Sequence, residues 1–268
     1  MTVRLQGIPY DAHSSFLRGP ALAPDAIREA FTCGSANYTT ELGVEVDPSK
    51  GTWTDLGNLE LTDDVELAVE HIRNASVVAM ADGSRILSLG GDHLVTWPVV
   101  QAVSATTSRL TIVHFDAHPD LYDELDGDRY SHACPFARIM EAGLADRLIQ
   151  IGIRTMTAHQ QEQAERFGVE VLHYREWDGL VPDVDGDVYV SIDVDALDPA
   201  FAPGVSHFEP GGMTVREIVD ALHQIGASGA RVLGADVVEV NPERDVHGLT
   251  AMVGAKLMRE LLGLLTTT

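Results

Sequence analysis

Short apolar runs alternate with segments of helical periodicity along the whole chain. A short apolar, β-branched run between turn residues predicts a buried strand, whereas apolar residues at every third or fourth position predict a helix with one buried face. The predicted strands are residues 3–8, 85–89, 110–115, 148–153, 188–194 and 231–240. The predicted helices are residues 24–31, 64–80, 95–104, 135–142, 158–167, 215–225 and 250–265. This alternation predicts an α/β fold in which helices cover both faces of a parallel sheet.

The stretches between these elements show no linker and no internal repeat. Residues 39–54 and 121–131 carry few periodic signals and are predicted to be surface loops. The chain has 268 residues, 45% of them hydrophobic, which is enough for one large core, so we expect a single domain over residues 1–268. Ligands of open parallel sheets bind at the carboxyl ends of the strands, and we therefore look for chemistry in the loops that follow them.

Composition excludes several classes of partner. The formal net charge of −23 predicts no nucleic-acid partner, because phosphate binding requires a basic surface. Lys50 and Lys256 are the only lysines, so the acidity reflects a shortage of lysine as well as a surplus of carboxylates. No stretch approaches the ~18 apolar residues of a membrane span, and residues 1–10 lack the layout of a signal peptide, so we predict a cytoplasmic protein with no membrane partner. Cys33 and Cys134 form no CxxC motif and are predicted to stay reduced.

The predicted strand 85–89 runs directly into the motif GGDH at residues 90–93. Its two glycines let the backbone turn sharply and leave His93 near the edge of the sheet. A single histidine at such a place is more often a hydrogen-bonded packing residue than a metal ligand. His93 becomes a candidate ligand only if the ends of other strands supply further ligands beside it.

The predicted strand 110–115 runs into DAHPD, which offers Asp116, His118 and Asp120 at a spacing of two. Residues two apart on a strand point to the same side, so these three side chains are expected to converge. An aspartate that caps a polar turn would explain one of them but not the whole set. We therefore interpret the motif as part of a metal site.

A third predicted strand, residues 188–194, ends in a second group of aspartates. Asp193 and Asp195 are expected to share one face, and an ionised carboxylate in an apolar strand must be paired or coordinate a cation. Asp198, which precedes a proline, is expected to organise the turn rather than to bind metal.

Together the three strand ends supply two histidines and four aspartates, which is a mixed nitrogen and oxygen set suited to Mn²⁺ and unlike the sulfur-rich sites of structural zinc. So many carboxylates require more than one cation to balance their charge. Two divalent ions ~3.5–4 Å apart would hold a water between them and lower its pKa toward neutrality, which makes it a nucleophile.

Two further residues are candidates for the chemistry. Glu239 lies near the end of the predicted strand 231–240, and a carboxylate there matches a planar guanidinium, unless it only forms a salt bridge at the edge of the core. His132 lies between a loop and a predicted helix start, where it would pass a proton to a departing amine. Nearby Cys134 has no base placed beside it by spacing, so it is interpreted as a packing thiol.

Four motifs, in their order along the chain, resemble those of the ureohydrolase family of arginases, agmatinases, guanidinobutyrases and formimidoylglutamases. They are GGDH at 90–93, DAHPD at 116–120, SIDVDALDPAFAPG at 191–204 and EVNP at 239–242. The likeness reaches both ends, because GIPYD at 7–11 and the segment 19–28 resemble the family's opening, and residues 251–265 resemble its closing helix. By this resemblance the chain is identified as an agmatinase-like member of the family.

This resemblance implies a three-layer α/β/α fold with a mainly parallel sheet of roughly eight strands, and a centre of two Mn²⁺ ions, with Ni²⁺ or Co²⁺ as alternatives. It assigns one ion to His93, Asp116, Asp120 and Asp193, and the other to His118, Asp116, Asp193 and Asp195. The activated water would attack the guanidinium carbon, Glu239 would hold the guanidinium nitrogens, and His132 would protonate the leaving amine. Family members are commonly trimers or hexamers, which predicts a homo-oligomer.

The sequence departs from the agmatinase pattern at two places. Residues 205–212 read VSHFEPGG where agmatinases usually read TGTPEPGG, and Ala133 stands where a glycine usually follows His132. The metal ligands are unaffected by either change. The part of the substrate distant from the guanidinium does not follow from them.

We predict that the substrate is agmatine, which would be cleaved to putrescine and urea and would place the protein in polyamine metabolism. The loop 121–131 lacks the Ser/Asn-rich appearance of the arginase loop that binds an amino-acid head group, which disfavours arginine. Acidic side chains of this loop favour a distal amine, whereas Arg129 favours a distal carboxylate, as in guanidinobutyrate or formimidoylglutamate. These acidic residues are Asp123, Glu124, Asp126 and Asp128.

Two other classes of function compete with this prediction. A regulatory subunit that binds metal without catalysis would have no chemical need for Glu239 and His132. A deacetylase-like amidohydrolase on a related fold would use one zinc ion with fewer carboxylates, so the number of bound ions separates the two.

Overall fold

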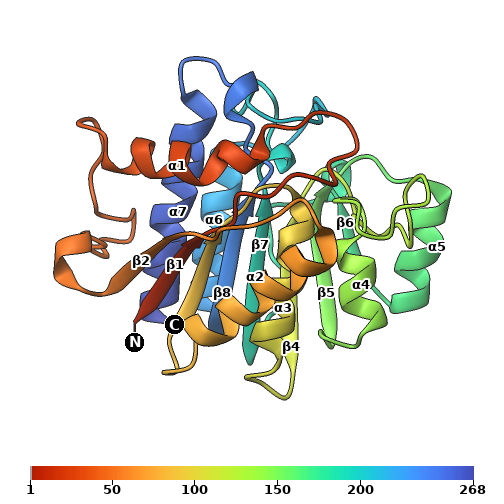
Figure 1. Ribbon diagram of the computed structural model, residues 1–268, viewed down its shortest axis with the longest axis horizontal. Helices are drawn as coiled ribbons and strands as arrows, with labels where there is room; N and C mark the ends of the chain where they lie inside the picture. The colour runs from red at the N-terminus through yellow and green to blue at the C-terminus, as the bar shows by residue number, and fades with distance from the viewer. Residues whose placement is uncertain (1) are drawn as a thin grey trace.

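One parallel sheet of eight strands forms the centre of the molecule, in the order β2-β1-β3-β8-β7-β4-β5-β6 (Figure 1). The computed structural model describes residues 2–268, so Met1, which the single-domain prediction includes, lies outside the described residues. The strands are β1 (Val3–Gly7), β2 (Trp53–Asn58), β3 (Arg85–Leu89), β4 (Leu110–Phe115), β5 (Arg147–Ile153), β6 (Glu170–His173), β7 (Asp187–Asp193) and β8 (Arg231–Val238). Each neighbouring pair is parallel, so all the carboxyl ends lie at one edge of the sheet.

Helices cover both faces of this sheet, as the resemblance implied. The helices are α1 (Ala23–Thr32), α2 (Val65–Ala79), α3 (Thr96–Ser104), α4 (Pro135–Glu141), α5 (Ala158–Phe167), α6 (Val215–Ala227) and α7 (Leu249–Thr267). Helices α1, α6 and α7 pack on one face, and α2, α3, α4 and α5 on the other (Figure 1). Leu87 and Leu89 of β3 join the first core while Ile86 joins the second, because successive side chains of a strand point to opposite faces. None of the helices formed by residues 2–268 is long and apolar enough to cross a membrane.

The six predicted strands and seven predicted helices are all present, with ends that differ by at most two residues. The two strands without a prediction, β2 and β6, lie at the outer edges of the sheet. An edge strand pairs on one side only and buries little, and five of the six residues of β2 are exposed, so neither edge carries an apolar run.

The prediction of a surface loop at residues 39–54 is wrong at its end. Trp53 begins β2 and is buried in the core beside Val46, whose carbonyl oxygen accepts a 2.8 Å hydrogen bond from the indole nitrogen. The two apolar side chains stand too far apart in sequence to give a periodic signal. Residues 121–131, by contrast, form no regular element.

The four central strands of the sheet carry the candidate residues. β3, β8, β7 and β4 are neighbours in that order, and His93, Glu239, Asp193 and Asp116 lie at or just after their carboxyl ends. The topology therefore brings segments that are far apart in the sequence to the middle of one edge.

Candidate metal centre and substrate pocket

The six predicted ligands meet in two groups that share Asp116. Around His93, the Nδ1 atom lies 3.2 Å from Asp116 Oδ2, 3.1 Å from Asp120 Oδ2 and 3.1 Å from Asp193 Oδ2. Around His118, the Nδ1 atom lies 3.0 Å from Asp195 Oδ2 and 3.5 Å from Asp116 Oδ1. Asp116 thus presents one carboxylate oxygen to each histidine, which is the arrangement of a bridging ligand.

A chain of hydrogen bonds behind His93 fixes its tautomer. Ser191 donates its hydroxyl proton to Asp236 Oδ1 at 2.7 Å, so its oxygen must accept from His93 Nε2, 3.0 Å away. Asp236 is fully buried and also accepts from Thr96 and from Tyr189. With the ring proton on Nε2, the lone pair of His93 Nδ1 points toward the three carboxylates.

This geometry fits divalent cations. A nitrogen lone pair and three carboxylate oxygens at about 3 Å repel one another unless a proton or a metal cation lies between them, because all four atoms are electron donors. Burial, together with the charges of Asp195 and Asp116, raises the pKa of Asp193 well above its ordinary value. Imidazole nitrogens with several carboxylates are a set that Mn²⁺ accepts.

The side chains converge for a different reason from the one predicted. β4 ends at Phe115, so Asp116, His118 and Asp120 follow the strand instead of alternating along it, and Asp120 has a left-handed φ of 50°. Likewise β7 ends at Asp193, and Asp195 lies in the 3₁₀ turn Val194–Ala196. Turns at the strand ends, and not the two-residue period of a strand, aim these ligands.

Asp198 organises the turn after β7, as expected. Its Oδ1 accepts from the backbone N–H of Ala200 at 2.8 Å, and its Oδ2 accepts from the N–H groups of Gly211 and Gly212 at 2.7 and 3.2 Å. These three bonds join the two ends of the segment that contains the divergent residues 205–208.

Two backbone expectations need correction. Neither Gly90 nor Gly91 has a positive φ, so they are not needed for a sharp turn. A side chain on Gly91 would overlap the carbonyl oxygen of Tyr10, and one on Gly90 would overlap Val238, so close approach is their reason. Glu239 lies beyond the end of β8 at Val238 and has φ 64°, which is a costly conformation for a side-chain-bearing residue.

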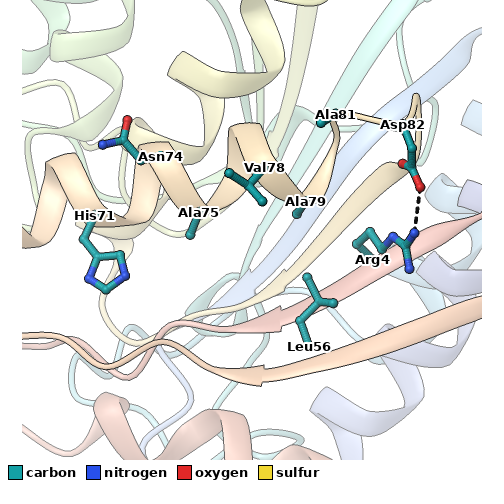
Figure 2. Close-up of a pocket in the computed structure, with 9 residues that line it drawn as sticks. All are labelled: Arg4, Leu56, His71, Asn74, Ala75, Val78, Ala79, Ala81 and Asp82. Atoms are coloured by element: carbon teal, nitrogen blue, oxygen red, sulfur yellow. Dashed lines mark hydrogen bonds and ion pairs between the residues drawn. The ribbon is translucent and has the colours of Figure 1, made fainter.

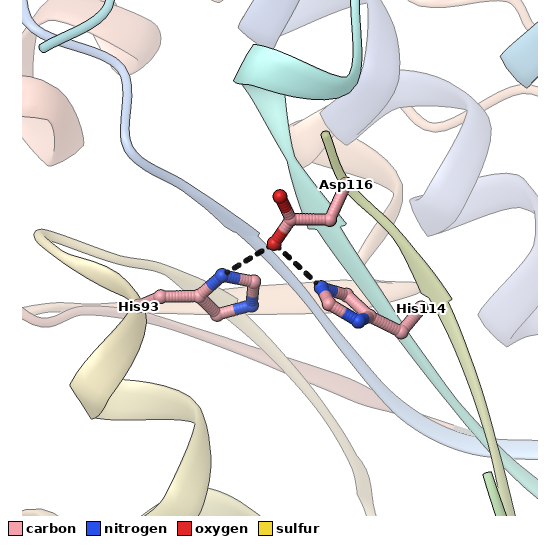
Figure 3. Close-up of side chains that lie close together, drawn as sticks. All are labelled: His93, His114 and Asp116. Atoms are coloured by element: carbon pink, nitrogen blue, oxygen red, sulfur yellow. Dashed lines mark hydrogen bonds and ion pairs between the residues drawn. The ribbon is translucent and has the colours of Figure 1, made fainter. Parts of the chain in front are cut away.

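His114 supports the ligands. It was not recognised from the sequence, although it lies only two residues before Asp116. Gln150 donates to His114 Nδ1 at 3.0 Å, so the ring proton lies on Nε2 and is donated to Asp116 Oδ2 at 2.8 Å. The ring stacks on Phe136 with centroids 3.9 Å apart. Figure 3 shows Asp116 between His93 and His114. A protonated Nε2 cannot coordinate a metal, so His114 orients Asp116 instead.

Glu239 and His132 form a buried pair beside the ligands. Glu239 Oε1 accepts from His132 Nδ1 at 2.7 Å and from the backbone N–H of His93 at 3.0 Å. Burial alone would lower the pKa of His132, but the adjacent Glu239 carboxylate outweighs it and raises that pKa to about 9. Burial would raise the pKa of Glu239, but His132 outweighs it and lowers that pKa. Cys134 is a buried free thiol whose pKa burial raises to about 12, in keeping with a packing role.

A cavity of about 200 Å³ opens above these residues. We call the six candidate ligands together with His132 and Glu239 the floor, and all of these except His93 and Asp116 line the cavity. We call the other residues of its lining the rim, which consists of Ser15, Tyr122, Leu125, Ala133, Thr155, Thr157, Gln160 and His207. Among the described lining residues there is no lysine or arginine, and every carboxylate belongs to the floor. Thr157 and Gln160 of the rim form the capping box that begins α5.

Three of the five charged residues of the loop 121–131 have ion-pair partners outside the rim, and none of the five lines the cavity. Asp123 lies 2.9 Å from His159, Asp128 lies 2.5 Å from His13, and Arg129 lies 2.9 Å from Glu141. From this loop only Tyr122 and Leu125 reach the cavity. The charges that were considered for a distal amine or carboxylate therefore do not line this cavity.

A larger cavity, of about 570 Å³, lies between α2 and the edge strand β2 (Figure 2). Arg4 and Asp82 form an ion pair in its wall at 2.7 Å, and its other described lining side chains are mostly apolar, with Leu56 and Val78 exposed. Within residues 2–268 its lining holds no group of converging ligands. The larger volume of this cavity therefore does not make it the candidate active site.

A parallel sheet that delivers this many oxygen donors to one buried point characterises metal-dependent hydrolases. The sequence profile of the arginase family matches residues 1–263, and the chain belongs to that family. It is therefore a hydrolase of C–N bonds in linear amidines, with a small guanidino compound as substrate, and its family works with a binuclear manganese centre.

Individual relatives show how similar the chain is to arginases and to an agmatinase. The chain is 47% identical to "Arginase 1, mitochondrial" of Arabidopsis thaliana over 96% of its own length and 79% of that protein. It is 32% identical to the agmatinase of Bacillus anthracis, over 97% of this chain and 90% of that one. The arginase structure from Medicago truncatula superimposes with a TM-score of 0.90 at 44% identity, covering 98% of this chain and 87% of that chain. The family and fold predicted from the motifs are confirmed.

Proposed function

We propose that this protein hydrolyses L-arginine to urea and ornithine. The observation that carries the proposal is the neutral rim above a charged floor. Free arginine has an ammonium and a carboxylate on one carbon, and the two charges balance each other, so hydroxyl and amide groups such as those of Thr155, Thr157 and Gln160 suit it. The 47% identity to an arginase, against 32% to an agmatinase, supports the same substrate.

The proposed ligand sets follow the two groups around the histidines. One manganese ion would be held by His93, Asp116, Asp120 and Asp193, and the other by His118, Asp116, Asp193 and Asp195. The bridging role of Asp116 is supported by the approach of its two oxygens to different histidines. When bound, the ions supply Lewis acidity that makes a water nucleophilic near neutral pH.

We propose that Glu239 orients the guanidinium. Its Oε1 is engaged by His132 and His93, and within residues 2–268 no group hydrogen-bonds Oε2, which leaves this oxygen for a guanidinium N–H. His132, held by Glu239 on Nδ1, would protonate the departing amine. Glu239 would thus bind the guanidinium of the substrate and also orient His132, the general acid.

Agmatine, the substrate predicted from the motifs, is the second candidate. It has the same guanidinium and a distal amine, and the agmatinase of Bacillus anthracis matches almost the whole chain. Against it, none of the described rim residues offers a carboxylate to the amine. Guanidinobutyrate and formimidoylglutamate are less well matched, because among these same rim residues their distal carboxylates would meet no cation.

A kinetic comparison of arginine, agmatine, guanidinobutyrate and formimidoylglutamate on the manganese-loaded protein tests this proposal. We expect kcat/KM for arginine to exceed that for every other substrate by at least about tenfold, the discrimination that a few hydrogen bonds at one end of a substrate supply. A higher value for agmatine would overturn the interpretation of the rim. No turnover of any of the four would instead favour the non-catalytic alternative.

We further propose that the chain is one domain that works in the cytoplasm as a homo-oligomer of three or six copies. The single sheet supports one domain, and two free cysteines are compatible with a reducing compartment. The Arabidopsis relative is named mitochondrial, so cell fractionation is the appropriate test of location. Light scattering of the purified protein tests the number of copies.

A further inference from the structure

A chain of polar contacts leads from Glu239 through His132 toward the surface. His132 Nδ1 lies 2.7 Å from Glu239 Oε1, and its Nε2 lies 2.8 Å from Ser15 Oγ. Ser15 Oγ lies in turn 3.5 Å from His207 Nε2. Ser15 belongs to the segment between β1 and α1, and its hydroxyl is exposed in the cavity.

The chemistry of these partners settles which atom of His132 exchanges a proton. A carboxylate only accepts hydrogen bonds, so Nδ1 donates to Glu239 and keeps its proton. Nε2 is then the nitrogen that is protonated or free, and its direct partner is Ser15. A hydroxyl accepts from a protonated Nε2 and donates to a neutral one, so Ser15 suits both states of the ring.

We propose that Ser15 relays the proton of His132 to the departing amine, and that His207 is a positioning residue that holds the Ser15 hydroxyl in place. The Nε2–H bond of His132 breaks as an O–H bond forms on Ser15. The former hydroxyl proton of Ser15 forms the new N–H bond on the amine nitrogen, whose bond to the guanidinium carbon breaks. Charge and protons balance, and His132 ends neutral. This relay rests on the proposed function of His132.

In this arrangement the divergent segment 205–208 helps to hold the loop that carries Ser15. The ring of His207 lies 4.9 Å from that of His132 and 5.7 Å from that of Phe16, measured between centroids. Ser206 Oγ donates to the carbonyl of Leu17 at 3.0 Å. The segment that replaces the usual agmatinase residues is therefore packed against the loop that carries Ser15.

The neighbouring Ser14 offers a matched control. Its hydroxyl donates to Asp92 Oδ2 at 3.2 Å, away from the imidazole of His132. Ser14→Ala therefore disturbs the same loop to a similar extent without removing the proposed relay.

The experiment compares Ser15→Ala, Ser15→Thr, His207→Leu and Ser14→Ala in the manganese-loaded enzyme, with kcat, KM, bound manganese and Tm as readouts. For Ser15→Ala we expect kcat to fall about 10- to 100-fold, which is part of the usual contribution of general acid catalysis. Its KM, two bound ions and Tm should stay near those of the wild type. Ser15→Thr should recover most of kcat because it keeps a hydroxyl, and His207→Leu should show a smaller fall than Ser15→Ala.

The outcomes separate this inference from the proposed function. A wild type that cleaves arginine, with Ser15→Ala within about twofold of it in kcat, overturns the relay and leaves the function standing. If Ser15→Ala loses manganese or thermal stability, and Ser14→Ala loses as much, the loop has a structural role and the relay is also overturned. A wild type that cleaves agmatine in place of arginine changes the substrate of the assay but not the test of Ser15.

Discussion

The floor and the rim of the pocket are built on different principles. Several charged side chains of the floor are held by a further buried group, as His93 is by Ser191 and Asp116 by His114. The rim consists of uncharged or weakly polar side chains, such as Thr155 and Leu125, on loops and at the start of α5. Reaction chemistry requires charges at fixed distances, whereas recognition of a zwitterion requires only donors and acceptors within reach.

This difference explains why relatives with different substrates share one fold. The floor lies at the ends of strands whose neighbours the sheet topology fixes. The rim comes from loops and from the start of α5, where Thr157 and Gln160 can change without disturbing the sheet. Substitutions at the two levels should therefore affect different kinetic constants.

The largest effect is expected from Asp116→Ala, which removes a carboxylate that faces both histidines. We expect loss of both manganese ions and a fall in kcat/KM of more than about 10³-fold, because the nucleophile is no longer activated. Elemental analysis and urea release measure the two effects. Asp198→Asn is the matched control, since Asp198 holds only backbone N–H groups, and it should keep both ions. Full metal occupancy in Asp116→Ala would contradict the bridging assignment.

Glu239→Gln is expected to separate binding of metal from catalysis within the floor. Two ions should remain, while kcat/KM falls about 10²- to 10³-fold through loss of the charge that orients the guanidinium. The activity of the wild type that depends on protonated His132 should decline as pH rises through about 9, the raised pKa of His132. Without the Glu239 charge, burial dominates and lowers that pKa, so the decline moves to lower pH.

Exposed Glu243 provides the control for this substitution, because it lies four residues further along the chain and outside the pocket. Glu243→Gln should leave both the rate and the pH profile unchanged. Unaltered catalytic efficiency in Glu239→Gln would remove Glu239 from substrate orientation.

The floor could be predicted from the sequence because its residues break the rule that buried strands carry apolar side chains. Asp116 and Asp193 are charged residues at the ends of apolar strands, and only a cation or a partner makes that tolerable. Their supports could not be predicted in the same way. Ser191 and His114 are ordinary residues of buried strands, and their roles depend on which strands are neighbours, which the sequence pattern does not state.

The rim and the edge strands of the sheet were harder still to predict from the sequence. Ser15 meets His132 across 117 residues of chain, and no spacing connects the two. β6 has only four residues, none of them fully buried, so tertiary pairing and not propensity makes it a strand. The charges of loop 121–131 could not indicate the substrate from the sequence, because their partners, such as His159 for Asp123, lie outside that loop.

Ser191→Ala tests whether a residue that orients a ligand matters for manganese binding as well as the ligands themselves. Loss of the hydroxyl frees His93 Nε2 from its acceptor and leaves a buried Asp236 oxygen without its donor. We expect manganese affinity to fall about 10- to 100-fold, as for other residues that orient metal ligands. Metal titration measures this, with Ser88→Ala as control because Ser88 is an equally buried strand serine that contacts Gln6. An affinity equal to that of the control would contradict the proposed support.

The smallest and most discriminating effect is expected at Gln160 of the rim. Its Oε1 accepts from the backbone N–H of Thr157 at 3.1 Å, and a glutamate serves this capping box equally well, so Gln160→Glu adds a charge without removing the helix cap. The Gln160 side chain is buried, so burial of the new charge opposes the ion pair and we expect a net contribution of only about 0.2–1 kcal/mol, which corresponds to roughly 1.5- to 5-fold. The ratio of kcat/KM for agmatine to that for arginine should rise by this factor, since only the amine of agmatine lacks a neighbouring carboxylate of its own. Gln161→Glu adds the same charge outside the cavity and should leave the ratio unchanged. An unchanged ratio in Gln160→Glu would mean that the far end of the substrate does not reach α5, and the division between floor and rim would have to be drawn elsewhere.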